Sequence, residues 1–368
     1  MPEKNTQVKA AQPLYFVNAP VDFLMIGGLS LIVFLILFPL RGAEKSLHAV
    51  YLAAFLLWVG NWPHFAATNW RLYHAKENLR QYPLTAFVVP LLLLGAVAAS
   101  FISPKDIAPY FVKLYLFWSP YHFSGQTMGL SLIYARRAGM VIGKAERYAL
   151  SGFVFGSFIL QNALAEVGNN TRTFYNISYP SLGLPPIVGT IALTVMWGSG
   201  AAFLIFIIRW SLKSKRMVPP IVLLPAVTQF FWFILGSSNM TYYEFVPFFH
   251  GAQYLLIAWA MQLKERMDMK GFAPSPVFVI RETAFWYAGI VVLGALLFWW
   301  APRLGTRFGF PLGFAEPIII SAIQIHHFFV DGVIWKLRNP KVGSPLLVNV
   351  GQLMRKPALA AAPIGRAS

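Results

Sequence analysis

The chain has 368 residues, of which 57% are hydrophobic and 12% are charged, and its mean hydropathy is +0.58. A soluble protein of this length needs more polar surface than this composition provides, so we expect the bilayer to be its main solvent. The net charge is +17. Because the basic residues lie in short loops between apolar segments, topology is a better explanation for this charge than nucleic-acid binding.

Apolar windows long enough to span a bilayer recur along the chain. In chain order, the ten windows are Val21–Leu40, Leu47–Ala66, Tyr82–Ile102, Ala108–Tyr134, Ala149–Glu166, Ile187–Trp210, Pro219–Gly236, Thr241–Leu263, Ala284–Ala301 and Pro317–Trp335. A single apolar segment satisfies its backbone hydrogen bonds in lipid only as a helix. We therefore predict an all-α fold, a polytopic transmembrane bundle of about ten helices.

The windows divide the chain into three predicted parts. These are a cytoplasmic N-terminal segment (residues 1–20), a single transmembrane helical domain (residues 21–336) and a basic cytoplasmic tail (residues 337–368). The first twenty residues lack the cationic, apolar and small-residue pattern of a cleaved signal peptide. We therefore expect the first window to be retained as a membrane helix.

Lysine and arginine are unevenly divided between the two sides of the predicted bundle. With ten helices, 23 of the 30 basic residues fall on one side and six on the other, and the last, Lys113, lies within a helix. Retained cytoplasmic loops carry the excess of basic residues. The distribution therefore predicts that both termini are cytoplasmic, and the composition fits a multi-pass protein of a bacterial inner membrane.

Histidine supplies most of the ionisable side chains inside the predicted helices, where such groups cost free energy and mark functional sites. The seven histidines are His48, His64, His74, His122, His250, His326 and His327. His48 and His74 fall near helix ends, and the other five lie within the second, fourth, eighth and tenth windows. The chain has no cysteine, which excludes thiolate metal sites, iron–sulfur clusters and disulfides.

The four histidine-bearing helices all run in the same direction in the predicted topology, so their histidines can be compared for depth. At about 1.5 Å per residue, His250 and the His326–His327 pair lie roughly 14 Å from the outer end, and His122 roughly 21 Å. His64 lies deeper. The pattern is compatible with one common centre but does not require it.

Hydrogen-bonding side chains follow three of these histidines at helical spacing. The pairs are His122 with Gln126, His250 with Gln253, and His327 with Asp331. An amide or carboxylate at this spacing can hold a liganding imidazole by its second nitrogen. We therefore expect Gln126, Gln253 and Asp331 to support a bound cofactor.

The residue types also restrict the metal. Imidazole ligation suits iron, copper or zinc, and the scarcity of intramembrane carboxylates argues against a carboxylate-bridged di-iron centre. The chain has no HxxxH cluster of the kind found in membrane desaturases. His326 and His327 are both candidates, but adjacent helical residues point about 100° apart. We favour His327, because Asp331 lies on the same helix face.

Two short segments resemble motifs of the bacterial Brp/Blh-type β-carotene 15,15′-dioxygenases. Pro63–Ala66 resembles a PHGA motif and Tyr121–Gly125 resembles a YHFG motif, although Phe65 replaces the motif glycine and Ser124 is an insertion. Members of that family are multi-helix membrane proteins in which four histidines hold a non-haem iron that uses dioxygen to cleave β-carotene. The resemblance implies that His64 and His122 are iron ligands.

The likeness covers about twenty residues, and the late histidine pair of the family has no counterpart in this chain. We infer His250 and His327 as the third and fourth ligands from topology, with His326 as the alternative to His327. The leading hypothesis is a non-haem iron oxygenase that acts on a lipophilic substrate such as a carotenoid. Two alternatives stay open: a haem b or quinone-linked electron-transfer protein, and a transporter with a histidine and aspartate proton relay.

Overall fold

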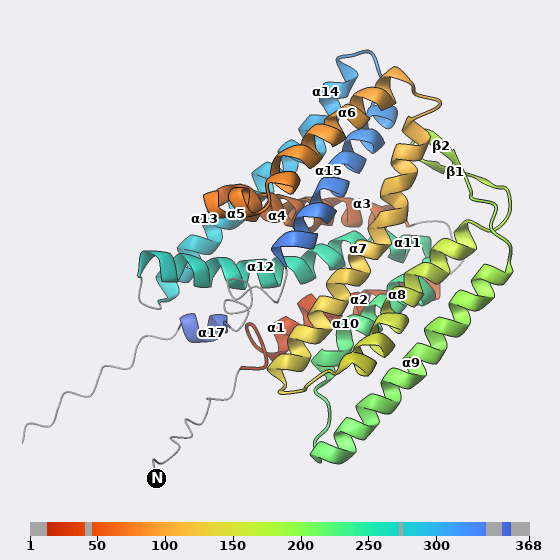
Figure 1. The fold of residues 1–368 in the computed structure, drawn as a ribbon. Coiled ribbons are helices and arrows are strands. Elements are labelled where there is room, and N and C mark those ends of the chain that lie inside the picture. The colour runs from red at the N-terminus through yellow and green to blue at the C-terminus, as the bar shows by residue number, and fades with distance from the viewer. Residues whose placement is uncertain (1–12, 41–45, 272–274, 336–347, 355–368) are drawn as a thin grey trace, which may run out of the picture.

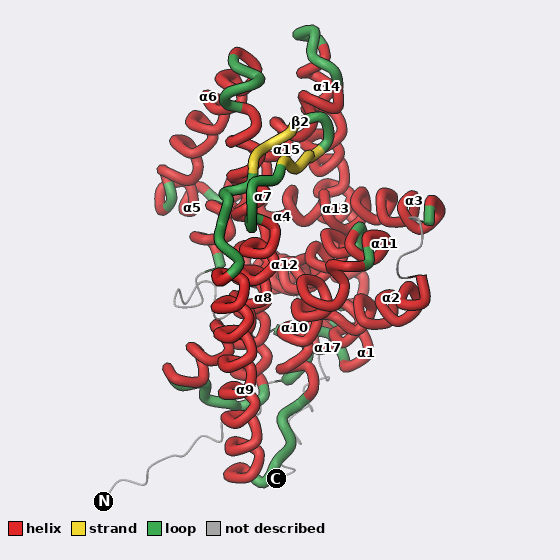
Figure 2. The backbone as a smooth tube through the Cα atoms, turned by 90° about the vertical axis from the view of Figure 1, so that its right-hand side faces the viewer, coloured by secondary structure: helices red, strands yellow, loops and turns green. Residues whose placement is uncertain are grey.

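The protein consists almost entirely of helices. A computed structural model describes residues 13–40, 46–271, 275–335 and 348–354. Within these residues the strands are two short ones, β1 (Thr171–Phe174) and β2 (Ile177–Pro180), which pair antiparallel in a hairpin. Figure 2 shows this hairpin as the one yellow element among red helices. The prediction of an all-α fold is confirmed.

Long helices form the body of the molecule (Figure 1). They are α6 (Val89–Ile102), α7 (Ala108–Arg137), α8 (Lys144–Ala165), α9 (Ile187–Ser214), α10 (Pro220–Phe230), α12 (Val246–Lys270), α13 (Pro276–Ala295) and α15 (Leu312–Ile334). Shorter helices are α1 (Ala19–Phe23), α2 (Leu29–Leu37), α3 (Leu47–Leu56), α4 (Trp62–His74), α5 (Lys76–Gln81), α11 (Met240–Tyr243), α14 (Ala301–Thr306) and α17 (Val350–Leu353). Turns of π-helix lie at Leu24–Gly28, Leu57–Asn61, Leu84–Val88, Phe231–Leu235 and Leu296–Trp300, and 3-10 turns lie at Phe38–Leu40 and Gly236–Ser238.

Seven helices of the described chain are long and apolar enough to cross a membrane. They are Ala19–Leu37, Leu84–Ile102, Lys144–Ala165, Ile187–Ser214, Pro220–Ser238, Pro276–Thr306 and Leu312–Ile334. The other three predicted spans are also helical but too polar to meet this criterion, so a count of ten spans is not confirmed. Those three (Leu47–His74, α7 and α12) carry His64, His122 and His250.

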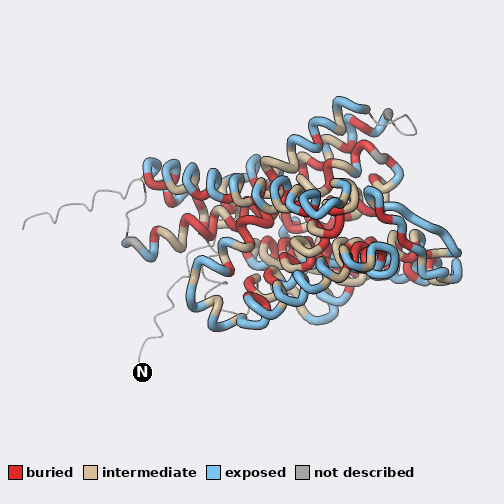
Figure 3. Tube along the Cα trace, turned by 90° about the horizontal axis from the view of Figure 1, so that it is seen from above, coloured by how far each residue is buried: buried red, intermediate tan, exposed pale blue. Residues whose placement is uncertain are grey.

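The histidine-bearing helices meet in the middle of the bundle. Helix α4 packs against α12, α13 and α15, and α15 packs in turn against α7. Helix α12 is clearly inclined to α7 and α15 in Figure 1, whereas α8 and α9 lie side by side at the edge. Seen from above, buried positions lie toward the inside and exposed ones on the outer surface (Figure 3). The outer face of α9 exposes Ile205, Ile208 and Leu212, as expected where a helix meets lipid.

Prolines break the helical hydrogen-bond ladder at several points, and more distant groups replace the missing donor. Pro63 cannot donate to the carbonyl four residues earlier, and the Tyr287 hydroxyl donates to that Val59 carbonyl at 2.6 Å. In the same way, Tyr73 Oη donates to the Ala86 carbonyl, four residues before Pro90, at 2.9 Å. These bonds tie neighbouring helices together where lipid offers no alternative partner.

Residues near the two ends of the described chain pack together against α7. The Arg137 guanidinium donates to the carbonyls of Pro13, Tyr15 and Val348 at 2.6–3.0 Å. The backbone N–H of Val350 donates to the carbonyl of Phe16 at 2.7 Å. Phe16 and Val350 are fully buried. The part of the predicted C-terminal tail that the structure describes is therefore joined to the N-terminal segment.

Candidate metal centre

Four histidines from four helices converge at one buried point. One ring nitrogen from each of His64 (α4), His122 (α7), His250 (α12) and His327 (α15) lies within 4.8 Å of the others. All four side chains are buried, with exposed fractions between 0 and 9%. Burying imidazoles together costs free energy where ring nitrogens have no partner, as for both nitrogens of His250 and Nδ1 of His327 among the described residues, unless the group binds something. The arrangement can hold a metal ion.

A backbone contact fixes the orientation of His64. Its Nδ1 lies 2.7 Å from the carbonyl oxygen of Asn61, so Nδ1 carries the proton of the neutral ring. The lone pair then lies on Nε2, which is 3.2 Å from Nε2 of His327. This is the usual way in which a carbonyl sets the tautomer of a liganding histidine.

Two of the spacings between the converging nitrogens match those around a single metal ion. Nε2 of His327 lies 3.1 Å from Nε2 of His122 and 3.2 Å from that of His64. With metal–nitrogen bonds of about 2.1 Å, adjacent ligand nitrogens lie about 3.0 Å apart in octahedral and about 3.4 Å apart in tetrahedral geometry. The observed distances lie between these two values.

His250 is held in place by packing. Phe123 stacks on its ring with centroids 3.9 Å apart and planes 14° apart. Neither ring nitrogen of His250 has a hydrogen-bond partner among the described residues. A Cβ at the next residue, Gly251, would lie 2.7 Å from the carbonyl oxygen of Gly60, so glycine lets α12 approach the backbone just ahead of His64.

Asp331 faces the side of the cluster on which the Nε2 atoms meet. Its Oδ2 lies 3.4 Å from Nε2 of His327 and 3.7 Å from Nε2 of His122. This differs from the expected role, in which the carboxylate holds the second nitrogen of His327. That nitrogen, Nδ1, has no partner among the described residues. The geometry places Asp331 where it could act as a fifth ligand or as a base beside a bound metal ion.

Three further side chains hold Asp331. Its Oδ1 lies 3.1 Å from Thr68 Oγ1 and accepts a hydrogen bond from Trp335 Nε1 at 3.2 Å. Tyr254 Oη joins the same network, 2.5 Å from Thr68 Oγ1 and 3.2 Å from Trp335 Nε1. The prediction did not include Thr68, Tyr254 or Trp335. Helical spacing was the available signal, because Thr68 follows His64 by four residues and Tyr254 follows His250 by four.

The two predicted amides lie beside the centre but bind backbone and each other. Gln126 Nε2 donates to the carbonyl of His250 and to Gln253 Oε1, both at 3.0 Å. Gln253 Nε2 donates to the carbonyl of Ile26 at 2.5 Å. Neither amide contacts an imidazole nitrogen in these hydrogen bonds. They fix α7, α12 and the first helix relative to one another.

His326 lies outside the cluster. Its Nε2 is 3.3 Å from the carbonyl oxygen of Thr85 and 3.3 Å from the Tyr73 hydroxyl. The reason is the rotation of about 100° between neighbouring residues of a regular helix, which turns His326 toward the segment before α6 when His327 faces inward. His326 is therefore not brought into the group as a ligand.

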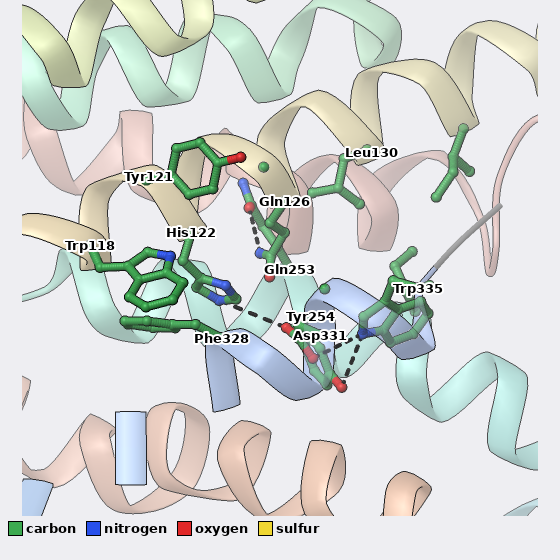
Figure 4. A pocket seen from close by; sticks show the side chains of 15 residues that line it. Trp118, Tyr121, His122, Gln126, Leu130, Gln253, Tyr254, Phe328, Asp331 and Trp335 are labelled. Carbon is green, nitrogen blue, oxygen red and sulfur yellow. Dashed lines mark hydrogen bonds and ion pairs between the residues drawn. The ribbon is translucent and has the colours of Figure 1, made fainter. Parts of the chain in front are cut away.

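A cavity of about 330 Å³ adjoins the histidine cluster. Its volume is within the range of small-molecule sites. Figure 4 shows Trp118 and Tyr121 of α7 and Phe328 of α15 around His122, with Asp331 and Trp335 further along. Of the four clustered histidines, His122 is the one that lines this cavity. A ligand in the cavity would therefore meet the centre at His122 and Asp331.

Comparison with known proteins identified no relative. No family model, no curated protein and no solved structure matches this chain.

Proposed function

We propose that the protein is a membrane metalloenzyme in which His64, His122, His250 and His327 bind one non-haem iron that oxidises a lipophilic substrate. The observation that carries the proposal is the convergence of four buried histidines beside a largely apolar cavity, with Nε2 of His327 3.1 Å from that of His122 and 3.2 Å from that of His64. The resemblance of the segments around His64 and His122 to the Brp/Blh-type dioxygenases is in line with the same role. A carotenoid is accordingly one candidate substrate.

Each residue has a defined part in this proposal. His64 presents its Nε2 lone pair because Asn61 holds the Nδ1 proton. Asp331 stands on the cavity side, where Oδ2 can bind the metal or accept a proton, while Thr68 and Trp335 hold Oδ1. When bound, iron would supply the redox chemistry that dioxygen requires. The aromatic walls of the cavity hold an apolar substrate beside His122 and exclude water.

The ligand types favour iron over the other metals. Four imidazoles would suit copper or zinc equally well, but a carboxylate oxygen on the open side is typical of non-haem iron sites. Haem b would need two axial imidazoles on opposite faces of a porphyrin. Nε2 atoms 3.1 Å apart, with rings packed edge to face, favour a single ion instead.

Proton transport is the second candidate, and one observation favours it. Asp331 connects His122 and His327 to Thr68 and Tyr254 in a continuous buried network. Connected ionisable groups inside a membrane protein often carry protons. This function requires no metal.

Metal analysis combined with an optical spectrum tests these proposals on protein purified from cells supplied with iron. The oxygenase proposal predicts about one iron per chain and no Soret band. It also predicts oxygen consumption with at least one member of a panel of lipid-soluble alkenes. A Soret band would favour haem. Metal-free, colourless protein would exclude both metal-dependent functions and favour proton transport.

A further inference from the structure

The cavity beside the histidine cluster reaches the outer surface of the bundle along a row of glycines. Gly125 and Gly129 of α7 and Gly332 of α15 all line it. A Cβ built on any of the three would have no atom within 4 Å, so open space lies in front of each glycine. Gly125 and Gly332 are exposed on the helix surfaces. These glycines mark an opening between α7 and α15.

On the part of α7 that precedes Gly125, aromatic contacts fill the space between α7 and α15. Phe328 of α15 packs against Tyr115, Trp118 and His122 of α7, with ring centroids 4.7–6.5 Å apart. Phe329 adds a contact with Trp118 at 5.1 Å. Together with the contact between His122 and His327, these are the ring contacts between α7 and α15 in the described part of the chain. From Gly125 onward, glycines replace the rings, and the cavity occupies the space between the helices.

The lining of the cavity defines what it can accept. Most of it is aromatic or aliphatic, including Leu130, Ile133 and Ile257, and the described lining residues include no lysine or arginine. An anionic head group would lose its hydration in such a lining and find no basic side chain to pair with. An opening to lipid with such a lining suits an uncharged, elongated chain.

We propose that an uncharged lipid chain moves sideways from the bilayer through the gap at Gly125, Gly129 and Gly332 and comes to rest beside His122 and Asp331. This inference rests on the proposed function, in which the lipid chain would be the substrate of the enzyme. The gap sets the access, because any larger side chain at the glycines would fill it. Binding of the chain itself needs no metal.

Photolabelling in nanodiscs tests the route. A long-chain alcohol carrying a diazirine is added to the lipid, irradiated, and its attachment sites are mapped by mass spectrometry. Leu130 and Ile257 are only 3 and 4% exposed, so a lipid probe reaches them only by entering the cavity. Label on the exposed face of α9, at Ile205, serves as the internal standard. The corresponding fatty acid, matched in length, tests the effect of charge.

The double variant Gly125→Leu/Gly129→Leu is expected to lose at least ten-fold of the label at Leu130 and Ile257 relative to α9. Gly198→Leu, on α9, is the matched control because a Cβ there also meets open space. Unchanged interior label in the double variant, or stronger labelling by the fatty acid than by the alcohol, would overturn the proposal.

The same preparations are analysed for iron, with labelling repeated after chelation. Interior label without iron would leave the lipid route standing and remove the oxygenase. Iron without label at Leu130 and Ile257 would exclude the lipid route and leave the oxygenase proposal standing.

Discussion

Oδ2 of Asp331 lies 3.4 Å from Nε2 of His327, the same nitrogen that faces His64 and His122. A carboxylate one helical turn after a liganding histidine often holds the far nitrogen of that ring. In this protein the carboxylate of Asp331 instead faces Nε2, the ring nitrogen of His327 that points to the other histidines. The negative charge is therefore placed where it can bind a cation directly, on the side from which the cavity opens.

Asp331→Asn is expected to weaken iron binding by 10–100-fold, because the amide keeps the shape of the side chain but loses its charge. Competition with a chelator of known affinity measures the change in detergent solution. Glu316→Gln, on the same helix, is the control and should bind iron like the wild type. Equal iron affinity for Asp331→Asn and wild type would limit Asp331 to a structural role.

Replacement of His327 by alanine is expected to abolish stoichiometric iron binding, as is replacement of His64, His122 or His250. His326→Ala is a closely matched control, since His326 precedes His327 and turns toward Thr85. Its iron content should stay at about one per chain. Iron loss in both variants of the pair would instead indicate damage to α15 in general.

Gly251→Ala is expected to lower iron affinity at least ten-fold without touching a ligand, because its Cβ would overlap the backbone of Gly60 and push α12 away from α4. Gly198→Ala places a methyl group in open space and should leave iron binding intact. Metal titration of both variants, alongside their circular dichroism spectra, checks the effect. Normal affinity in Gly251→Ala would show that the close approach is not required.

Tyr287→Phe removes the donor that serves the Val59 carbonyl beside Pro63. We expect a loss of about 0.5–1.5 kcal/mol in the free energy of unfolding, the usual worth of such a bond in a membrane protein. Denaturation in mixed micelles measures it. Tyr51→Phe changes an exposed tyrosine, 71% accessible, and should be neutral. Equal free energies of unfolding for Tyr287→Phe and Tyr51→Phe would show that the hydrogen bond from Tyr287 to Val59 makes no net contribution to stability.

The absence of cysteine makes the predicted orientation easy to test. Lys215→Cys after α9 and Ser178→Cys in the hairpin lie on opposite sides in the predicted topology. A membrane-impermeant maleimide applied to intact bacterial cells should label Ser178→Cys and leave Lys215→Cys unlabelled, because basic loops stay inside. The reverse pattern would place the basic side outward.

Much of the fold followed from composition, because lipid permits few structures other than helices for long apolar segments. The number of spans did not follow in the same way. Leu47–His74, α7 and α12 carry three of the four clustered histidines and other polar residues, and are therefore less apolar. These helices are the ones that a hydropathy criterion passes over. The polar residues that mark the site also lower the mean hydropathy of the three helices that carry them.

The depths predicted for the histidines spread over more than a helical turn, yet their ring nitrogens gather within 4.8 Å. The prediction treated every helix as straight and equally inclined. In the structure α12 is inclined to α7 and α15, and a π-helical turn at Leu57–Asn61 precedes His64. Such local changes in helix geometry depend on tertiary packing and are not visible in hydropathy.

The spacing of polar residues after the four clustered histidines indicates a larger site than we predicted. Each clustered histidine has a polar side chain four residues later: Thr68, Gln126, Tyr254 and Asp331. One turn along four helices, these form a second layer beside the imidazoles, and three of them share hydrogen bonds. The prediction included Gln126 and Asp331 but neither Thr68 nor Tyr254. Comparison across helices would have identified the layer.

The joining of Pro13–Val17 to Val348–Val350 through Arg137 has a consequence for biosynthesis. Helix α7 is made early, but the Arg137 guanidinium can bind the carbonyl of Val348 only after more than two hundred further residues have been translated. Until then, the early segment lacks part of its packing. Assembly of this end of the molecule therefore finishes only after residue 350 has been translated.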